Sequence, residues 1–347
     1  MKILIPIKQS NRIDDNPYVS VLCEGLRLYA HEVICSIEEF WNNPTKYDLI
    51  FIQWPDVLPS KKQIESQDIE EIEKNIKKIK NKGVKMMVTV HNLHPHNNNQ
   101  YIKKIYELVY ESVDAFHHMG NYSYEKFKKK YANAIHFVVP HAVNFDESIA
   151  CLDKIEYKKK YGLPLNKPTV IAFGAFRNND ERSMFLDLSR TFFFKCCFWA
   201  PSFNRVIGIK RNKLQKIATR IKYRFQGIKM FRGPINNVQA IEMVKASDIL
   251  FIQRKEILNS GNLPLGFFCG CIVLGPDEGN VGDILRSTGN LTFNPHSKDS
   301  IHSAFIKALT MSKGNSNLGL KNAEYAKKNW NKHLIMEKIN KNIVSMF

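Results

Sequence analysis

Short apolar runs alternate with amphipathic stretches from the start of the chain, and this alternation constrains the fold more than any other feature of the sequence. Apolar, β-branched runs bounded by turn residues are typical of buried strands, and the stretches between them have the apolar period of helices. Such an order predicts a doubly wound parallel sheet. The expected strands are residues 2–7, 32–37, 48–54, 85–90, 113–118 and 136–140, and the expected helices are residues 18–29, 64–82 and 100–112.

A second alternation begins after a proline-containing stretch at residues 145–167, and its first expected strand is residues 169–174. A chain of 347 residues is long enough for two domains that each bury a core. We therefore expect an α/β protein with two Rossmann-like domains that face each other across a cleft. The predicted boundaries are 1–150 for the first domain, 151–330 for the second, and 331–347 for a helix that returns to the first.

The composition is that of a globular protein, with 44% hydrophobic and 24% charged residues, and no apolar run has the length of a membrane span. Residues 1–7 are too short for a signal sequence and fit a core strand, which predicts a cytoplasmic protein. Seven cysteines, mostly inside apolar stretches, lack the paired spacing of a metal site. We expect them to be reduced core thiols.

The excess of positive charge lies in the second half of the chain. Residues 1–150 carry 19 basic and 19 acidic residues, whereas residues 151–347 carry 32 and 14. Within that half, residues 205–232 hold ten basic residues and no acid, together with the apolar stripe Leu214, Ile217, Ile221 and Phe225. The charge would attract phosphate on a nucleotide, a lipid headgroup or a nucleic acid. The stripe predicts an amphipathic helix that packs on the domain.

A group of histidines follows the expected strand 85–90, with His91 first and His94 and His96 soon after. Open α/β sheets bind ligands beyond the carboxyl ends of their strands. The histidines could bind a metal, could be loop residues that cap the next helix, or could face a ligand, and the asparagines at 97–99 supply no carboxylate for a metal. A ligand-facing role is favoured for His91, since imidazole can donate or accept a proton near neutral pH.

The loop after strand 169–174 carries candidate phosphate ligands. Gly174 would let the backbone approach a ligand, and Arg177 and Arg182 could clamp a diphosphate through charge-assisted hydrogen bonds. Plain surface charge explains the two arginines as well.

Two later loops have the same ambiguity. Ser260, Gly261 and Asn262 open an apolar helix whose first amides could hold an anion, or Ser260 or Asn262 could simply cap that helix. Glu278 follows the expected strand 271–275, where it could bind ribose hydroxyls or cap the helix near 281–286.

Four segments resemble motifs of one known family. Residues 88–96 are similar to its T-x-H-N-x-x-P-H run, residues 138–143 to its I-P-H-G, Gly174 with Arg177 and Arg182 to its G-R-x-x-x-x-K, and residues 232–249 to the stretch before its donor site. The chain thus resembles the GT-B glycosyltransferases, most of all the family 4 type with members in bacterial polysaccharide synthesis.

The resemblance implies a metal-independent enzyme of the hexosyltransferase type, without a cofactor, that moves a sugar from a nucleotide diphosphate sugar to a glycan or lipid-linked acceptor. His91 would be catalytic, and Asn16, Tyr18, Asn92 and His96 would bind the acceptor. The donor would contact Gly174, Arg177, Arg182, Ser260, Gly261, Asn262 and Glu278. An anionic membrane on the inner face is a further expected partner, and nucleic acid is not.

The chain departs from the family at its pair of glutamates eight positions apart, where it has Ile257 and Leu265. Glu256 lies one residue out of register. This departure leaves the stereochemical class open and keeps a non-catalytic GT-B relative as an alternative. A basic phosphate- or nucleic-acid-binding protein that uses residues 205–232 is the alternative from another class.

Overall fold

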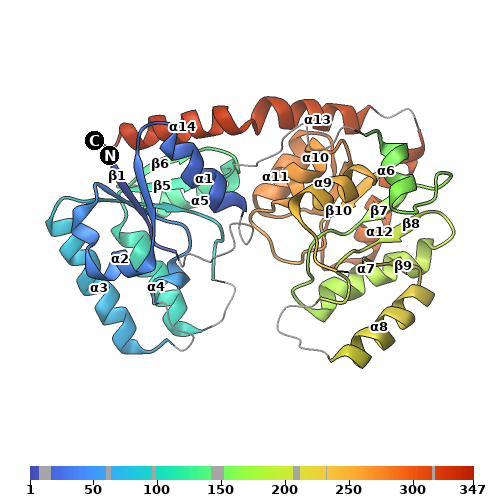
Figure 1. Ribbon diagram of the computed structural model, residues 1–347, viewed down its shortest axis with the longest axis horizontal. Coiled ribbons are helices and arrows are strands. Elements are labelled where there is room, and N and C mark those ends of the chain that lie inside the picture. The colour runs from blue at the N-terminus through green and yellow to red at the C-terminus, as the bar shows by residue number, and fades with distance from the viewer. Residues whose placement is uncertain are drawn as a thin grey trace. The chain divides into compact units, whose positions relative to one another are not determined.

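The computed structural model describes residues 1–7, 17–59, 64–95, 99–141, 152–205, 212–231, 233–314 and 317–347. The chain forms two compact units. The first consists of Met1–Asn144 and Asn329–Phe347, and the second of Phe145–Lys328. Each unit has its own sheet and its own helices (Figure 1).

The first unit is built on a six-stranded parallel sheet with the order β2-β1-β3-β4-β5-β6. Every residue of β3 is buried, as expected when helices cover both faces of a parallel sheet. The strands are β1 (Lys2–Ile5), β2 (Glu32–Cys35), β3 (Leu49–Ile52), β4 (Lys85–Thr89), β5 (Ala115–His118) and β6 (Ile135–Val138).

The helices of the first unit come from both ends of the chain. They are α1 (Pro17–Arg27), α2 (Ile37–Asn42), α3 (Ser66–Asn81), α4 (Gln100–Ser112), α5 (Asn121–Lys130) and α14 (Lys332–Val344), with short 3-10 turns at Pro44–Lys46 and Pro55–Val57. The side chain of Met336 in α14 fills the space that a Cβ at Gly25 in α1 would need. Lys332 Nζ lies 3.2 Å from Glu24 Oε2. The C-terminal helix therefore completes the first unit.

The second unit has another six-stranded parallel sheet, in the order β12-β11-β10-β7-β8-β9. Its core includes the buried rings of Phe185, Phe198, Phe251 and Phe293. The strands are β7 (Thr169–Ile171), β8 (Cys197–Trp199), β9 (Ile228–Lys229), β10 (Ile249–Phe251), β11 (Ile272–Pro276) and β12 (Leu291–Phe293). The helices are α6 (Lys154–Lys160), α7 (Asn179–Phe192), α8 (Lys213–Phe225), α9 (Asn237–Lys245), α10 (Asn262–Phe268), α11 (Gly279–Ser287), α12 (Lys298–Lys313) and α13 (Leu318–Asn329).

The two sheets share one arrangement at their amino ends. Asp48 precedes β3, and its carboxylate accepts a 2.7 Å hydrogen bond from the backbone N–H of Lys2. Asp248 precedes β10 and accepts a 2.8 Å hydrogen bond from the N–H of Thr169. In both units an aspartate therefore fastens a central strand to the first strand of its sheet.

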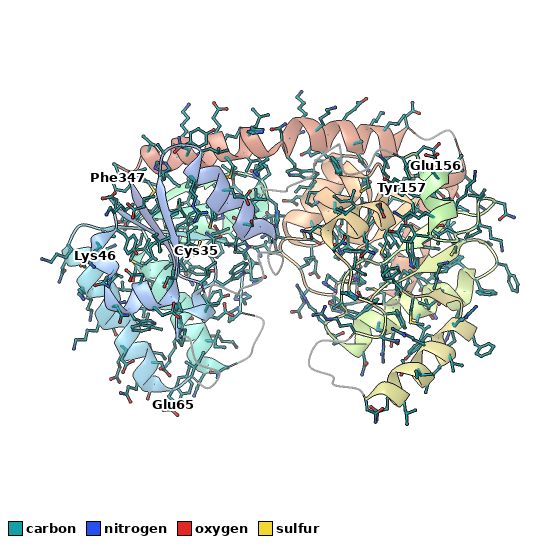
Figure 2. All side chains as sticks on the ribbon, viewed as in Figure 1. Cys35, Lys46, Glu65, Glu156, Tyr157 and Phe347 are labelled. Carbon is teal, nitrogen blue, oxygen red and sulfur yellow. The ribbon has the colours of Figure 1, made fainter. Side chains whose placement is uncertain are left out.

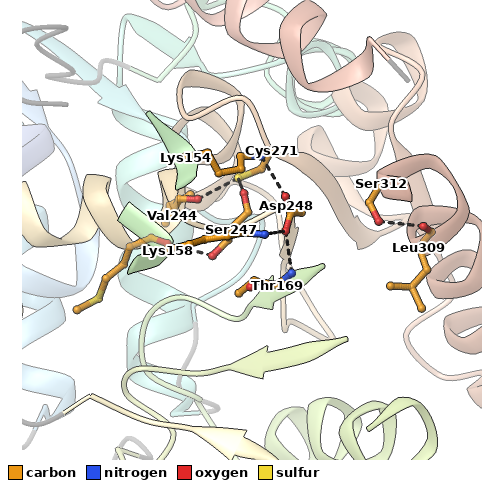
Figure 3. A network of polar contacts seen from close by, with 10 residues as sticks. Lys154, Lys158, Thr169, Val244, Ser247, Asp248, Cys271, Leu309 and Ser312 are labelled. Atoms are coloured by element: carbon orange, nitrogen blue, oxygen red, sulfur yellow. Dashed lines mark hydrogen bonds and ion pairs between the residues drawn. The ribbon is translucent and has the colours of Figure 1, made fainter. Parts of the chain in front are cut away.

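In the second unit this aspartate also belongs to an ion-pair network (Figure 3). Lys158 and Lys154 of α6 place their Nζ atoms 2.7 and 3.3 Å from the Asp248 carboxylate. Tyr157 is buried on the same helix, whereas its neighbour Glu156 closes a capping box at the helix start (Figure 2). Pairing allows Lys158 to be buried. The network holds α6 on the sheet.

The α/β class with parallel sheets, predicted from the alternating pattern, is confirmed. The predicted strand 32–37 is too long, because Ser36 caps α2 by accepting a hydrogen bond from the N–H of Glu39. We did not predict α2, α5, α7, α12 or β8 from the sequence. The three residues of β8 are too few to show a period.

The prediction that the amphipathic helix of residues 205–232 packs on the domain through its apolar stripe is wrong. α8 is present, but Leu214, Ile217, Ile221 and Phe225 are exposed. Tyr223 is buried in their place. It lies nine residues from Leu214, about two and a half turns of helix, so it projects from the opposite face.

Candidate functional site

Each sheet has one point where the chain connections leave in opposite directions, and open α/β sheets bind ligands beyond the strand ends at such a point. In the first sheet it lies between β1 and β3, and in the second between β7 and β10. Soon after β3 and β10 come Gln53 and Gln253, whose side chains are fully buried. We therefore describe two candidate sites, one in each unit.

The site of the first unit is a cluster of four rings. His91 follows β4 and stacks on Trp54, with 4.5 Å between the ring centroids. Tyr18 of α1 meets His91 edge-on at 5.2 Å and contacts His141 at 4.9 Å. His91 Nε2 donates to Gln53 Oε1 at 3.2 Å, which fixes the orientation of the imidazole. His91 is therefore held by defined ring contacts and one hydrogen bond at the carboxyl edge of the first sheet.

His91 is held in its neutral form. Burial, together with the neighbouring His141 and His117, lowers the pKa of His91 well below the usual range. Burial also lowers the pKa of His117 in β5, to about 4. A neutral imidazole can accept a proton from a hydroxyl group of a substrate. The lowered pKa also makes His91 a weak base, so its neutral form favours a hydrogen bond to such a hydroxyl over full proton transfer.

The other predicted acceptor residues are placed less directly. Tyr18 is buried, so it supports the imidazole from within. Asn92 is half-buried next to His91, and its carbonyl accepts a 3.3 Å hydrogen bond from the hydroxyl of Tyr110 in α4. Asn16 and His96 lie outside the described residues. The structure thus brings Tyr18 and His91 together among the predicted residues of this unit.

The site of the second unit is organised around one backbone carbonyl. Phe173, beyond β7, accepts 2.8 Å hydrogen bonds from the side-chain amides of both Gln253 and Asn262. Gly174 follows with a φ of 89°, which a residue with a Cβ rarely adopts, and a Cβ there would meet nothing within 4 Å. The glycine is therefore required by the backbone turn, and open space lies in front of it.

A buried carboxylate clamps the next part of this loop. Glu181, in the first turn of α7, accepts a 2.8 Å hydrogen bond from the N–H of Arg177 and pairs at 2.8 Å with Arg254. Arg254 also donates to the carbonyl of Ala175 at 3.1 Å. The guanidinium of Arg177 donates to the carbonyl of Glu256 at 2.9 Å. Residues 175–177 are thereby fixed against the segment that follows β10.

Arg182 has different surroundings from Arg177. Its guanidinium donates to Asn179 Oδ1 at 2.8 Å and lies over the rings of Tyr223 and Phe203, at 5.3 and 6.0 Å. A joint grip of the two arginines on one diphosphate would require Arg182 to leave these contacts. Arg177 is therefore the better placed of the predicted pair.

For the two remaining loops, the sequence left ligand binding and helix capping as alternatives. Ser260 Oγ accepts a 3.2 Å hydrogen bond from the N–H of Asn262, and Gly261 between them has open space around its Cα. Ser260 and Asn262 are thus engaged in local contacts, but neither is the N-cap of α10, because that position belongs to Gly261 and no side chain caps the helix. Glu278 stands before α11 without a side-chain capping bond, so the capping interpretation fails for this residue.

Several residues of these sites were missed by the sequence analysis, chiefly Gln53, Gln253, Arg254 and Glu181. One signal could have found the glutamines. Residues 48–53 read Asp-Leu-Ile-Phe-Ile-Gln and residues 248–253 read Asp-Ile-Leu-Phe-Ile-Gln, so nearly the same strand, with the same first and last residues, occurs twice. Such a repeat marks equivalent positions in two similar sheets.

The described residues form neither a metal cluster nor a membrane-spanning helix. Within the described ranges, no group of three or more His, Cys, Asp or Glu side chains could hold a metal ion, and the six cysteines there are free thiols. No helix in this part of the chain is both long enough and apolar enough to span a bilayer.

Comparison with known proteins yields a match in structure but not in sequence. No protein-family profile and no curated protein sequence matches the chain. Sucrose-phosphate synthase from Thermosynechococcus elongatus superposes with a TM-score of 0.74 at 11% identity, over 100% of this chain and 98% of that one. The structure of Alr3699/HepE from Anabaena in complex with UDP-glucose superposes with a TM-score of 0.68 at 12% identity, over 99% of this chain and 100% of that one.

A glycosyltransferase from Rickettsia africae matches with a TM-score of 0.65 at 11% identity, over 98% of this chain and 97% of that one. At such identities the likeness establishes the fold. Both parallel sheets and the returning C-terminal helix fall within the matched length. The chain therefore has the GT-B fold of the glycosyltransferases.

Proposed function

We propose that the protein is a glycosyltransferase that moves a sugar from a nucleoside diphosphate sugar to a glycan or lipid-linked acceptor, in the synthesis of a surface polysaccharide such as a capsule. The observation that carries this proposal is the GT-B fold over the whole chain. The HepE structures solved with UDP and with UDP-glucose support a nucleoside diphosphate sugar as the donor.

In this proposal the donor lies against the second unit. The clamp of Glu181 and Arg254 holds the backbone of residues 175–177 in place before the donor arrives, so that Arg177 can neutralise the charge of the leaving diphosphate. Preorganised charge of this kind is often the largest catalytic contribution. The donor-binding set is Gly174, Arg177, Arg182, Ser260, Gly261, Asn262 and Glu278. No metal ion and no cofactor are needed.

The acceptor lies against the first unit. His91, neutral and oriented by Gln53, accepts the proton of the attacking hydroxyl or holds that hydroxyl by a hydrogen bond. Asn16, Asn92 and His96 would contact the rest of the acceptor, with Tyr18 behind His91. The protein would act in the cytoplasm, at the inner face of the membrane, with an anionic membrane surface as a partner and without nucleic acid.

A non-catalytic GT-B relative is the second candidate, and one observation favours it. Leu265, which stands where the resemblance expects a glutamate, is buried in α10, and Ile257 holds the other position. A protein of this kind would bind a nucleotide sugar without transferring the sugar.

The test is calorimetric titration of UDP-glucose into the wild type and into Arg177→Ala, followed by release of UDP in the presence of acceptor extract. Loss of one charge-assisted contact should weaken donor binding by about tenfold or more. Arg190→Ala removes an exposed arginine from the last turn of α7 and should leave the affinity unchanged.

Equal affinity of the wild type and Arg177→Ala would contradict the donor assignment. Binding without release of UDP would favour the non-catalytic relative. No binding of any nucleotide sugar would reject both.

A further inference from the structure

α8 lies at the edge of the second unit (Figure 1), and its large apolar residues are exposed. Leu214 is 76% exposed and Phe225 86%, and Ile217 and Ile221 between them are also exposed. These four residues follow one another at helical spacing and form a single stripe, which we call the α8 stripe. A surface helix normally turns such a stripe to the core, so here the helix is inverted.

The helix is held in this orientation by its opposite face. Tyr223 is buried, with its ring 4.8 Å from that of Phe203 and the guanidinium of Arg182 lying over it at 5.3 Å. At the carboxyl end, the hydroxyl of Ser189 in α7 donates to the carbonyl of Gln226 at 3.2 Å. The exposure of the stripe is therefore fixed by packing and is not a consequence of a detached helix.

Two further aromatic residues extend the stripe. Phe193 and Phe194, just after α7, are exposed, and the centroids of their rings lie 5.2 Å apart. The ring of Phe193 occupies the space beside Gly227 that a Cβ would need, two residues beyond Phe225. The apolar surface thus continues from α8 onto the end of α7. Patches of several large apolar side chains mark interaction surfaces.

The charge on α8 itself has one sign. Arg220, Lys222 and Arg224 lie on α8 between the stripe and the buried face, and the sequence from 205 to 232 contains no acidic residue. Long basic side chains beside an apolar stripe can reach lipid phosphates while the stripe enters the acyl boundary. This combination suits a surface that is both anionic and apolar beneath its charge.

We propose that the α8 stripe, with Phe193 and Phe194, docks the protein on an anionic lipid bilayer. The proposal rests on the proposed function, for which it names the membrane-binding element. A nucleic acid would satisfy the cations but would leave the four aliphatic and aromatic side chains of the stripe in water. A second copy of the chain would bring the same basic residues face to face, and like charges repel.

Docking of α8 on a membrane would also connect the membrane surface with the predicted donor site. Tyr223 projects from the buried face of α8 onto Arg182, a predicted donor ligand. A membrane that holds the outer face of α8 would therefore act on the helix that supports this arginine.

The experiment is flotation of the full chain with vesicles of phosphatidylcholine alone or mixed with phosphatidylglycerol. We expect binding to the mixed vesicles, about tenfold or more weaker at high salt, and little binding to the neutral ones. The double variant Leu214→Ser and Phe225→Ser should lose binding by about tenfold or more. Leu320→Ser, at a leucine of α13 that is 69% exposed, is the matched control and should bind as the wild type does.

Circular dichroism and UDP-glucose affinity of each variant separate docking from folding and from the donor site. Retained vesicle binding by the double variant, salt-dependent binding to DNA alone, or dimerisation that the double variant abolishes would each overturn the proposal. Vesicle binding without UDP-glucose binding would support docking and count against the proposed function.

Discussion

The two units contain nearly the same central strand, but the side chains that follow this strand differ between them. In each, an aspartate fastens a central strand to the first strand, and the run Phe-Ile-Gln leads to the carboxyl edge. Beyond Gln53 the first unit builds a cluster of aromatic and neutral histidine rings. Beyond Gln253 the second unit builds a network of arginines and a buried glutamate. The comparison shows that the strand is common to both units and that the side chains after it differ in their chemistry.

The largest expected difference between the units is in their response to acid. His117 and His118 are fully buried in the first unit, and burial lowers their pKa values to about 4 and about 3. Histidines in the unfolded chain bind protons below about pH 6.5, whereas these two cannot do so in the folded state. Their contribution to the stability of the first unit is therefore complete above that pH and is lost as the pH falls towards 4 for His117 and towards 3 for His118.

At pH 5 the loss should be about 2 kcal/mol of unfolding free energy for each of the two histidines. Hydrogen exchange followed by mass spectrometry at pH 7 and pH 5 reports each unit separately, once corrected for the intrinsic exchange rate. Protection should fall in the first unit much more than in the second. An equal fall in both units would contradict this difference.

The next effect separates the two aspartates. Removing the carboxylate of Asp248 leaves Lys158, whose side chain is 8% exposed, without its partner, and an unpaired buried charge costs about 3 kcal/mol. Asp48 is exposed, so Asp48→Ala should cost only about 1 kcal/mol. Urea denaturation of both variants measures the two values. If Asp48→Ala were the more damaging variant, the ion-pair network around Asp248 would not be the distinguishing feature.

A smaller effect is expected at the Glu181 clamp. Glu181→Gln should cost about 2 kcal/mol, because Arg254 loses a buried charged partner, and it should weaken UDP-glucose binding by loosening the Arg177 loop. The matched control is Asp180→Asn, one residue away. Its carboxylate is exposed and pairs with Lys255 at 3.4 Å, so little change is expected. Thermal unfolding and titration of UDP-glucose give both readouts, and equal effects of the two variants would remove the clamp from the account.

The elements with a strong apolar period could be predicted, and those that depend on distant contacts could not. β3 is a continuous apolar run, and it was found. The helix signal at α7 was present in Asn178, whose side chain accepts a hydrogen bond from the N–H of Glu181, but it was not used in the prediction. Which face of α7 is buried depends on how the helix packs against the sheet, and the sequence alone does not reveal that packing.

Parts of the sites could be predicted because they follow strand ends. His91 and Gly174 were selected on that ground, and both lie at the carboxyl edges. The stacking of His91 on Trp54 joins segments that are far apart in sequence, and so does the bond from Gln253 to Phe173. The exposure of the α8 stripe could not be predicted either, because it depends on the burial of Tyr223 on the opposite face of the helix.

The most direct measurement of the central claim is hydrogen exchange of the full chain with and without UDP. The account predicts protection of residues 173–182 and 253–262, with no change in residues 48–54. Protection confined to the first unit, or no protection anywhere at saturating UDP, would contradict the assignment of the donor to the second unit.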